Sequence, residues 1–197
     1  MRRIATILSF ILVLLAGTSI ANASSINYIF QATGTGSLGG TQFSNASFTL
    51  TVVGDTDNVQ NEGGGLFLNA ATSAQIAIQG FQVADFTTLV GMFDYQPGNA
   101  LGLQRAPQMA DILDLSDPAF SSYDLTTPIG PLLVANPFIG QFNCDRGCIE
   151  TSQGELEFTD MSSVTFSATT VPEPGTLVLV GAGVLGLVGR LRQKVKL

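Results

Sequence analysis

The chain has 197 residues, no histidine and a formal net charge of −7. Because histidine is absent, Ser-His-Asp catalysis, Cys-His catalysis and imidazole metal sites are all excluded. Between Ser24 and Val171 there are 14 acidic residues against only Arg105 and Arg146, a net charge of −12. This charge argues against nucleic acid as a partner, since binding to DNA or RNA requires clustered cations.

Residues 1–23 have the three parts of a secretory signal peptide. The basic start "MRR" precedes an apolar run that ends at about residue 16, and Ala21 and Ala23 form a small-residue cleavage site. We expect cleavage before Ser24. An uncleaved N-terminal anchor is the alternative, but the short apolar run and the A-x-A exit favour cleavage. The rest of the chain is therefore predicted to be exported.

Residues 24–170 are predicted to form one all-β domain, a single antiparallel β-sandwich or jelly-roll-like structure. Apolar and polar residues alternate in four segments, as they do in half-buried antiparallel strands. The repetitive "ATGTGSLGGT" indicates a twisted edge strand or a bulged strand, because no Lys-Ser/Thr follows it to complete a phosphate loop. The four alternating segments are "SFTLTVV" (47–53), "QIAIQ" (75–79), "ELEF" (155–158) and "SVTFSA" (163–168).

The loop "GDTDNVQNEGG" holds the weak candidates for a metal site. Asp55, Asp57 and Glu62 could supply hard oxygen ligands to Ca²⁺. The EF-hand pattern is broken, however, because Val59 takes a ligand position and Gln60 takes the position of the required glycine. An ordinary polar turn is the favoured interpretation, since turns use the same residue types.

A second group of acids lies in "DILDLSDP", where Asp111, Asp114 and Asp117 have helical spacing. Leu113 and Leu115 alternate as in a strand, and this alternation predicts that Asp114 faces away from the other two acids. A shared site is therefore not expected. Paired acids could serve a glycosidase, but spacing along the sequence does not give the separation of the carboxyl groups.

The two cysteines, Cys144 and Cys148, stand in "NCDRGC". In an oxidising compartment we expect them to form a disulfide, because a thioredoxin-like site would have two intervening residues and a zinc site would need two more ligands. A loop this short contributes roughly 2 kcal/mol, which is enough to pin the tip of a hairpin.

Residues 171–197 have the layout of a short membrane anchor. Within "LVLVGAGVLG" the glycines fit the pattern G-x-G-x-x-G, but only eleven residues follow Gly186 and none is acidic. They cannot complete a nucleotide-binding βαβ unit. The apolar run of 14 residues before the basic tail would form a helix of about 21 Å, short of the bilayer core of about 30 Å. A buried core helix is the alternative, but the cationic tail favours the membrane.

The segment "VPEPGTLVLVGAGVLGLVGRLRQKVKL" resembles the PEP-CTERM sorting signal of exported bacterial proteins. The resemblance covers about 27 residues and consists of a sorting motif, a short transmembrane helix and a basic tail. It implies an exosortase as a transient membrane partner, a membrane-anchored precursor exported through the inner membrane, and final placement at the cell surface or outside the cell. The motif is Pro172, Glu173 and Pro174, and the tail cations are Arg190, Arg192, Lys194 and Lys196.

The expected function is that of a non-enzymatic, secreted surface or extracellular-matrix protein with no cofactor, associated with exopolysaccharide or biofilm. The alternative is a secreted carbohydrate-binding, carbohydrate-active or calcium-dependent binding domain.

Overall fold

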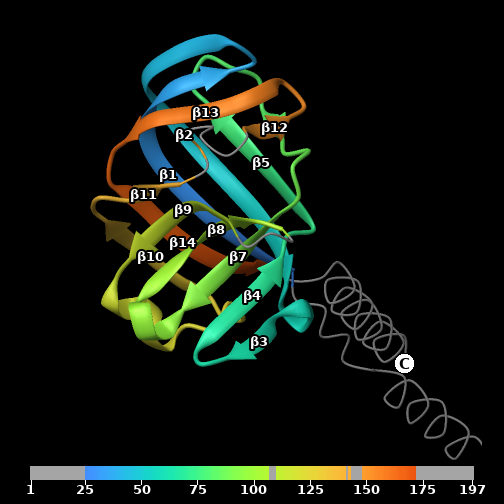
Figure 1. The fold of residues 1–197 in the computed structure, drawn as a ribbon, viewed down its shortest axis with the longest axis vertical. Coiled ribbons are helices and arrows are strands. Elements are labelled where there is room, and N and C mark those ends of the chain that lie inside the picture. The colour runs from blue at the N-terminus through green and yellow to red at the C-terminus, as the bar shows by residue number, and fades with distance from the viewer. Residues whose placement is uncertain (1–24, 107–109, 141, 143–147, 172–197) are drawn as a thin grey trace, which may run out of the picture.

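The computed structural model describes residues 25–171, except 107–109, 141 and 143–147. Within this part of the chain, two antiparallel β-sheets pack face to face (Figure 1). The all-β prediction is therefore confirmed. The predicted signal peptide with Ala21, Ala23 and Ser24 lies outside the described residues, as do the sorting motif and the basic tail. No described helix is long and apolar enough to cross a membrane.

Sheet A contains eight strands, ordered β10-β14-β1-β2-β5-β6, while β13 pairs with β1 and β12. Sheet B contains six, ordered β11-β9-β8-β7-β4-β3. The strands of sheet A are β1 (Ser25–Leu38), β2 (Thr41–Asp55), β5 (Ser73–Ile78), β6 (Ala84–Asp85), β10 (Ile129–Val134), β12 (Ile149–Thr151), β13 (Gly154–Met161) and β14 (Val164–Val171).

The strands of sheet B are β3 (Gln60–Gly63), β4 (Leu66–Ala70), β7 (Val90–Tyr95), β8 (Ala100–Arg105), β9 (Ala110–Ser116) and β11 (Phe138–Ile139). Three short 3₁₀ helices complete the described structure: η1 (Thr56–Asn58), η2 (Gln96–Gly98) and η3 (Pro118–Ser122).

The alternating segments form strands whose apolar positions face the space between the sheets. In β2, for example, Phe48, Leu50 and Val52 are buried, and threonines occupy the opposite face. This is the period of two that a half-buried strand requires. The same burial holds for Ile76 and Ile78 of β5, for Leu156 and Phe158 of β13, and for Val164, Phe166 and Ala168 of β14.

β1 is the central strand of sheet A. It pairs with β2 along one edge, and along the other edge it pairs first with β14 and then with β13. The register shifts around Gly34 and Gly36 confirm the predicted bulged strand, whereas the edge-strand interpretation is wrong because β1 has partners on both sides. A Cβ atom at Gly36 would lie 1.9 Å from the Glu157 carbonyl oxygen, so only glycine fits this close approach.

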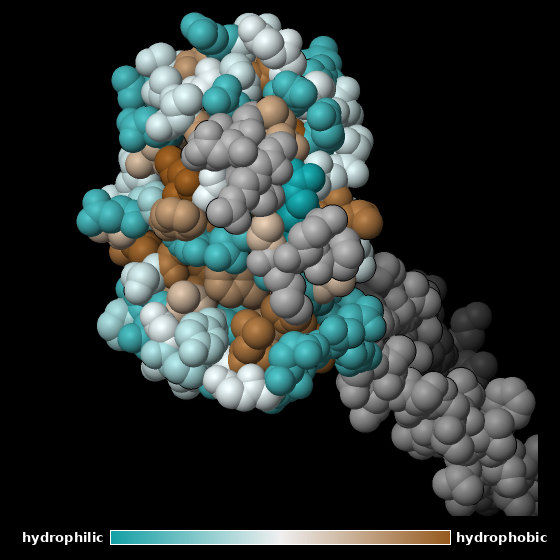
Figure 2. Space-filling view, in the orientation of Figure 1, coloured by the Kyte–Doolittle hydropathy of each residue, from teal (hydrophilic) through white to brown (hydrophobic). Residues whose placement is uncertain are grey.

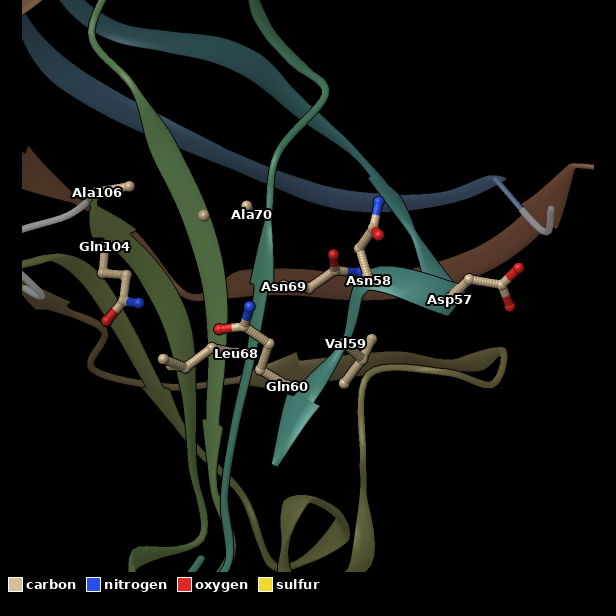
Figure 3. A pocket seen from close by; sticks show the side chains of 10 residues that line it. Asp57, Asn58, Val59, Gln60, Leu68, Asn69, Ala70, Gln104 and Ala106 are labelled. Atoms are coloured by element: carbon tan, nitrogen blue, oxygen red, sulfur yellow. The ribbon is translucent and has the colours of Figure 1, made fainter. Parts of the chain in front are cut away.

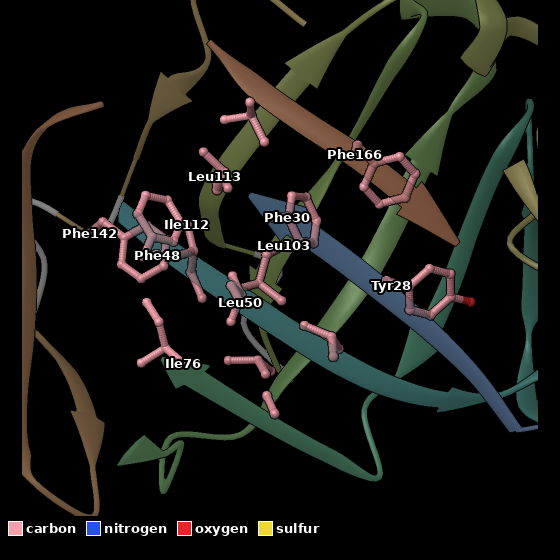
Figure 4. Close-up of a cluster of buried hydrophobic side chains, with 14 of the residues drawn as sticks. Tyr28, Phe30, Phe48, Leu50, Ile76, Leu103, Ile112, Leu113, Phe142 and Phe166 are labelled. Atoms are coloured by element: carbon pink, nitrogen blue, oxygen red, sulfur yellow. The ribbon is translucent and has the colours of Figure 1, made fainter. Parts of the chain in front are cut away.

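Aromatic rings fill much of the core. The ring of Phe158 lies 4.8 Å from that of Phe48, 5.3 Å from that of Phe43 and 5.2 Å from that of Phe142, measured between centroids. Figure 4 shows Phe30 of β1 beside Phe166 of β14, whose centroids are 5.0 Å apart. These tilted and edge-on arrangements are the favourable geometries for aromatic pairs.

Replacement of Phe158 by alanine should lower the free energy of unfolding by about 3–5 kcal/mol, because it leaves a cavity among three other rings. The measurement is equilibrium denaturation of the full chain. The control is Phe138→Ala in β11, where the side chain is 60% exposed and the expected change is within about 0.5 kcal/mol. Equal losses from the two variants would show that Phe158 is not a centre of the core.

Candidate functional site

A buried polar cluster lies between the sheets. The Asn69 Nδ2 group donates a hydrogen bond to the Tyr28 hydroxyl at 2.8 Å, and that hydroxyl donates to the Leu125 carbonyl at 2.6 Å. Gly54 makes room for the pair, since a Cβ atom there would lie 2.6 Å from Asn69 Nδ2. Burial raises the pKa of Tyr28, so its hydroxyl stays protonated and can keep donating.

Asp94 lies at an inward position of β7, alongside the apolar Val90 and Met92. Its side chain is fully buried, and neither carboxyl oxygen has a hydrogen-bond partner among the described residues. Burial, with a smaller contribution from the nearby Asp124, raises the pKa of Asp94 from 3.8 to about 8. Asp94 is therefore predominantly uncharged at neutral pH.

The raised pKa of Asp94 makes the domain less stable as the pH rises. Between about pH 4 and pH 8 the folded protein holds a proton that the unfolded chain has released, so the free energy of unfolding falls across this window. Asp94→Asn should reduce that fall and make the domain more stable than the parent above pH 8, while Asp114, whose pKa is also raised, to about 7, keeps its own share of the fall between about pH 4 and pH 7. Melting temperatures measured from pH 4 to pH 9 check this.

The matched control for this experiment is Asp160→Asn, at an exposed position of β13. It should retain the fall in stability seen in the parent. If Asp94→Asn and the parent lose stability in parallel with rising pH, another group carries the pH dependence.

The outer face of sheet B carries a cleft of about 530 Å³ (Figure 3). Leu68 and Ala70 of β4 and Gly91 of β7 form its apolar part. Residues 57–60, which run from η1 into β3, line one side, and Gln104 and Ala106 line the other. Apart from Asn69, whose amide N–H is bonded to Tyr28, the cleft is bordered by the amides of Asn58, Gln60 and Gln104 around a small apolar surface.

Gln104 is the most enclosed of these amides, with 8% of its surface exposed. It lies on the outer face because its neighbour Leu103 points into the core. Neither end of its amide group is hydrogen-bonded to a described residue, although the amide can both donate and accept. Nothing in the sequence marks Gln104 as a site residue, since an outward glutamine in a strand carries no distinctive signal.

The acids of "DILDLSDP" lie differently from the prediction. Gln104 pairs with Asp111 and Leu103 with Leu113, so Ile112 is an extra residue in β9. This bulge places Ile112 in the core and leaves Asp111 and Asp114 together on the outer face. The predicted separation of these two carboxylates by simple alternation is therefore wrong.

Asp111 and Asp114 both have raised pKa values. Burial, with a smaller contribution from the neighbouring Asp111, raises the pKa of Asp114 to about 7. Burial also raises the pKa of Asp111. Asp117 does not join them, because its carboxylate accepts the Ala119 N–H at 2.8 Å and caps η3.

The loop with the candidate calcium ligands is a polar turn. The Asp55 carboxylate accepts the Asp57 N–H at 2.9 Å and the Asn58 Nδ2 group at 3.3 Å. Glu62 is exposed in β3. Within the described part of the chain, no three side chains of the types His, Cys, Asp and Glu are grouped closely enough to hold a metal ion.

Arg105 connects the end of β8 to the approach to β12, since its Nη2 group donates to the Cys148 carbonyl at 2.9 Å. The predicted disulfide between Cys144 and Cys148 stays a prediction, because Cys144 lies outside the described residues.

The two ends of the described chain meet at one corner of sheet A. Val171, the last residue of β14, pairs with Ser25 at the start of β1, and Ser25 pairs on its other side with Asp55 of β2. β10 pairs with β14 only between Val164 and Ala168. β14 therefore stays paired with β1 up to Val171, the last described residue.

No curated protein and no solved structure matches the chain. The profile of the PEP-CTERM protein-sorting motif does match it, over residues 170–193. This match begins at Thr170, the second-last residue of β14, and includes the predicted motif Pro172-Glu173-Pro174 and the cations Arg190 and Arg192. The chain is therefore a protein that contains a PEP-CTERM sorting motif, as its C-terminal sequence predicts.

Proposed function

We propose that the chain is a non-enzymatic protein of the cell surface or the extracellular matrix, anchored first in the inner membrane and then processed by an exosortase. The PEP-CTERM motif implies an exported protein that an exosortase sorts. We further propose that the domain enters an exopolysaccharide matrix and acts there without catalysis.

One observation carries this proposal: the sorting motif begins where the folded domain ends. Thr170 and Val171 belong both to the matched motif and to β14, where they pair with Ile26 and Ser25. A cut on the C-terminal side of Val171 would remove the rest of the motif and leave every strand of sheet A complete. This arrangement suits a tag that is used once and then discarded.

The composition supports a binding or structural role over a catalytic one. The complete sequence has no histidine, which removes the commonest general base and the base of the usual nucleophilic triads. The exported stretch from Ser24 to Val171 carries a net charge of −12, and such a charge favours solubility once the domain is free.

The sorting step is tested by replacing Pro172, Glu173 and Pro174 with alanine in a host that contains the processing enzyme. Because the enzyme then lacks its recognition motif, the body should stay attached to its tail, and the protein should shift from the released fraction to the membrane fraction. The matched control is the triple variant Thr87→Ala, Thr88→Ala and Leu89→Ala in the body. If the motif variant and the parent fractionate identically, the segment does not act as a sorting signal.

The position of the cut is a separate expectation. β14 lies between β10 and β1, so removal of its residues would break the middle of sheet A. The released protein should therefore end at Val171 or later, and its intact mass should show this. A released product that ends before Val164 and still melts cooperatively would contradict the expectation.

A further inference from the structure

We propose that the cleft on the outer face of sheet B binds a neutral sugar unit of an oligosaccharide or polysaccharide. The inference goes beyond the sorting of the chain, because it concerns direct binding by the β domain. It rests on the unpartnered amide of Gln104, on the amides opposite, on the apolar floor between them and on the charge around the cleft.

Gln104 is the first support. Only 8% of this residue is exposed, it lines the cleft, and its amide makes no hydrogen bond to a described residue. Its amide atoms are not among the fully buried polar atoms that lack a partner, so they remain accessible to a ligand. A ligand that offers both a donor and an acceptor would satisfy the two ends of the amide, and neighbouring sugar hydroxyls offer both.

The opposite side of the cleft supplies further groups of the same kind. Gln60 also lines the cleft, and no hydrogen bond involves its side chain within the described structure. The Asn58 Nδ2 group donates a hydrogen bond to the Asp55 carboxylate at 3.3 Å. The side-chain carbonyl oxygen of Asn58 therefore remains available as an acceptor. Figure 3 shows Gln60 between Gln104 and the residues of η1. Amides on both sides can therefore reach hydroxyl groups on two edges of one ring.

Leu68 and Ala70 give the cleft an apolar floor. Small ligands bind in concave sites that combine apolar lining with a few convergent polar groups, and 530 Å³ lies within the usual size of such sites. The C–H face of a sugar ring can lie on this floor while its hydroxyls reach the amides. On the part of the surface that Figure 2 leaves uncovered, apolar residues occur in separate patches among hydrophilic ones.

Charge selects for a neutral ligand. Asp57 lies on one side of the cleft, and Asp111 is the register partner of Gln104 on the other. Among the described residues that line the cleft there is no lysine or arginine. An anionic sugar would therefore approach two carboxylates with no cation to bind it, whereas a neutral hydroxyl-bearing ring meets no such penalty.

The test is a titration of the full chain, purified in a detergent without sugar head groups. Neutral trisaccharides of glucose, galactose and mannose are the probes, and an oligouronate of the same length is the charged comparison. At least one neutral trisaccharide should bind, and the oligouronate should bind at least tenfold more weakly. Gln104→Leu should weaken the binding about tenfold or more, since it removes both hydrogen-bonding ends of the amide.

Two further variants keep the result interpretable. Ala70→Leu adds bulk to an exposed position of the floor, so it should block the sugar without removing any buried group, even if Gln104→Leu does not fold. Gln75→Leu is the matched control, because Gln75 is exposed on the outer face of sheet A, and it should bind like the parent.

Three outcomes would overturn the proposal: no neutral trisaccharide binds at millimolar concentration, the oligouronate binds as tightly as the neutral probes, or Ala70→Leu binds unchanged. None of these outcomes affects the sorting experiment, in which the Pro172, Glu173 and Pro174 variant is scored only by where the protein fractionates.

Discussion

The rest of the structure depends on the long antiparallel pairing of β1 with β2 on one side and with β14 and β13 on the other. β2 pairs with β1 from Ser25 to Leu38 with one shift in register, and β14 and β13 follow one another along the opposite edge. Glycine at position 36 allows the backbone of β13 to approach. These four strands present their apolar face to sheet B, and the aromatic core forms between the two sheets.

The same pairing joins the sorting segment to the candidate binding cleft. Val171 pairs with Ser25, Ser25 pairs with Asp55, and the Asp55 carboxylate then holds the first turn of η1. η1 lines one side of the cleft. A continuous series of paired residues therefore connects the end of β14 to η1. In this way the C-terminal end of the described domain is linked to one side of the cleft.

Local pattern predicted parts of β2, β5, β13 and β14, but it did not predict the departure from alternation in β9. Phe48, Leu50 and Val52 are buried as their spacing predicts, because that period follows from backbone geometry alone. Ile112 departs from it, since the bulge that moves Asp111 to the outer face depends on pairing with β8. Asp94 did leave a signal, an acid at an inward position after Val90 and Met92. The cleft left none, because it combines residues from β3, β4, β7 and β8.

The distribution of charge limits how the domain could be held in an extracellular matrix. We expect contacts between uncharged groups to be more important than ion pairs. The cations of the sorting signal lie in the tail, and the stretch from Ser24 to Val171 is left with Arg105 and Arg146 against 14 acids. Arg105 is already hydrogen-bonded to the Cys148 carbonyl. Once the tail is removed, the body would repel anionic surfaces and other copies of itself. Under the proposed role, attraction to an uncharged polysaccharide would come from hydrogen bonds and apolar contact, and the cleft beside Gln104 offers groups for both.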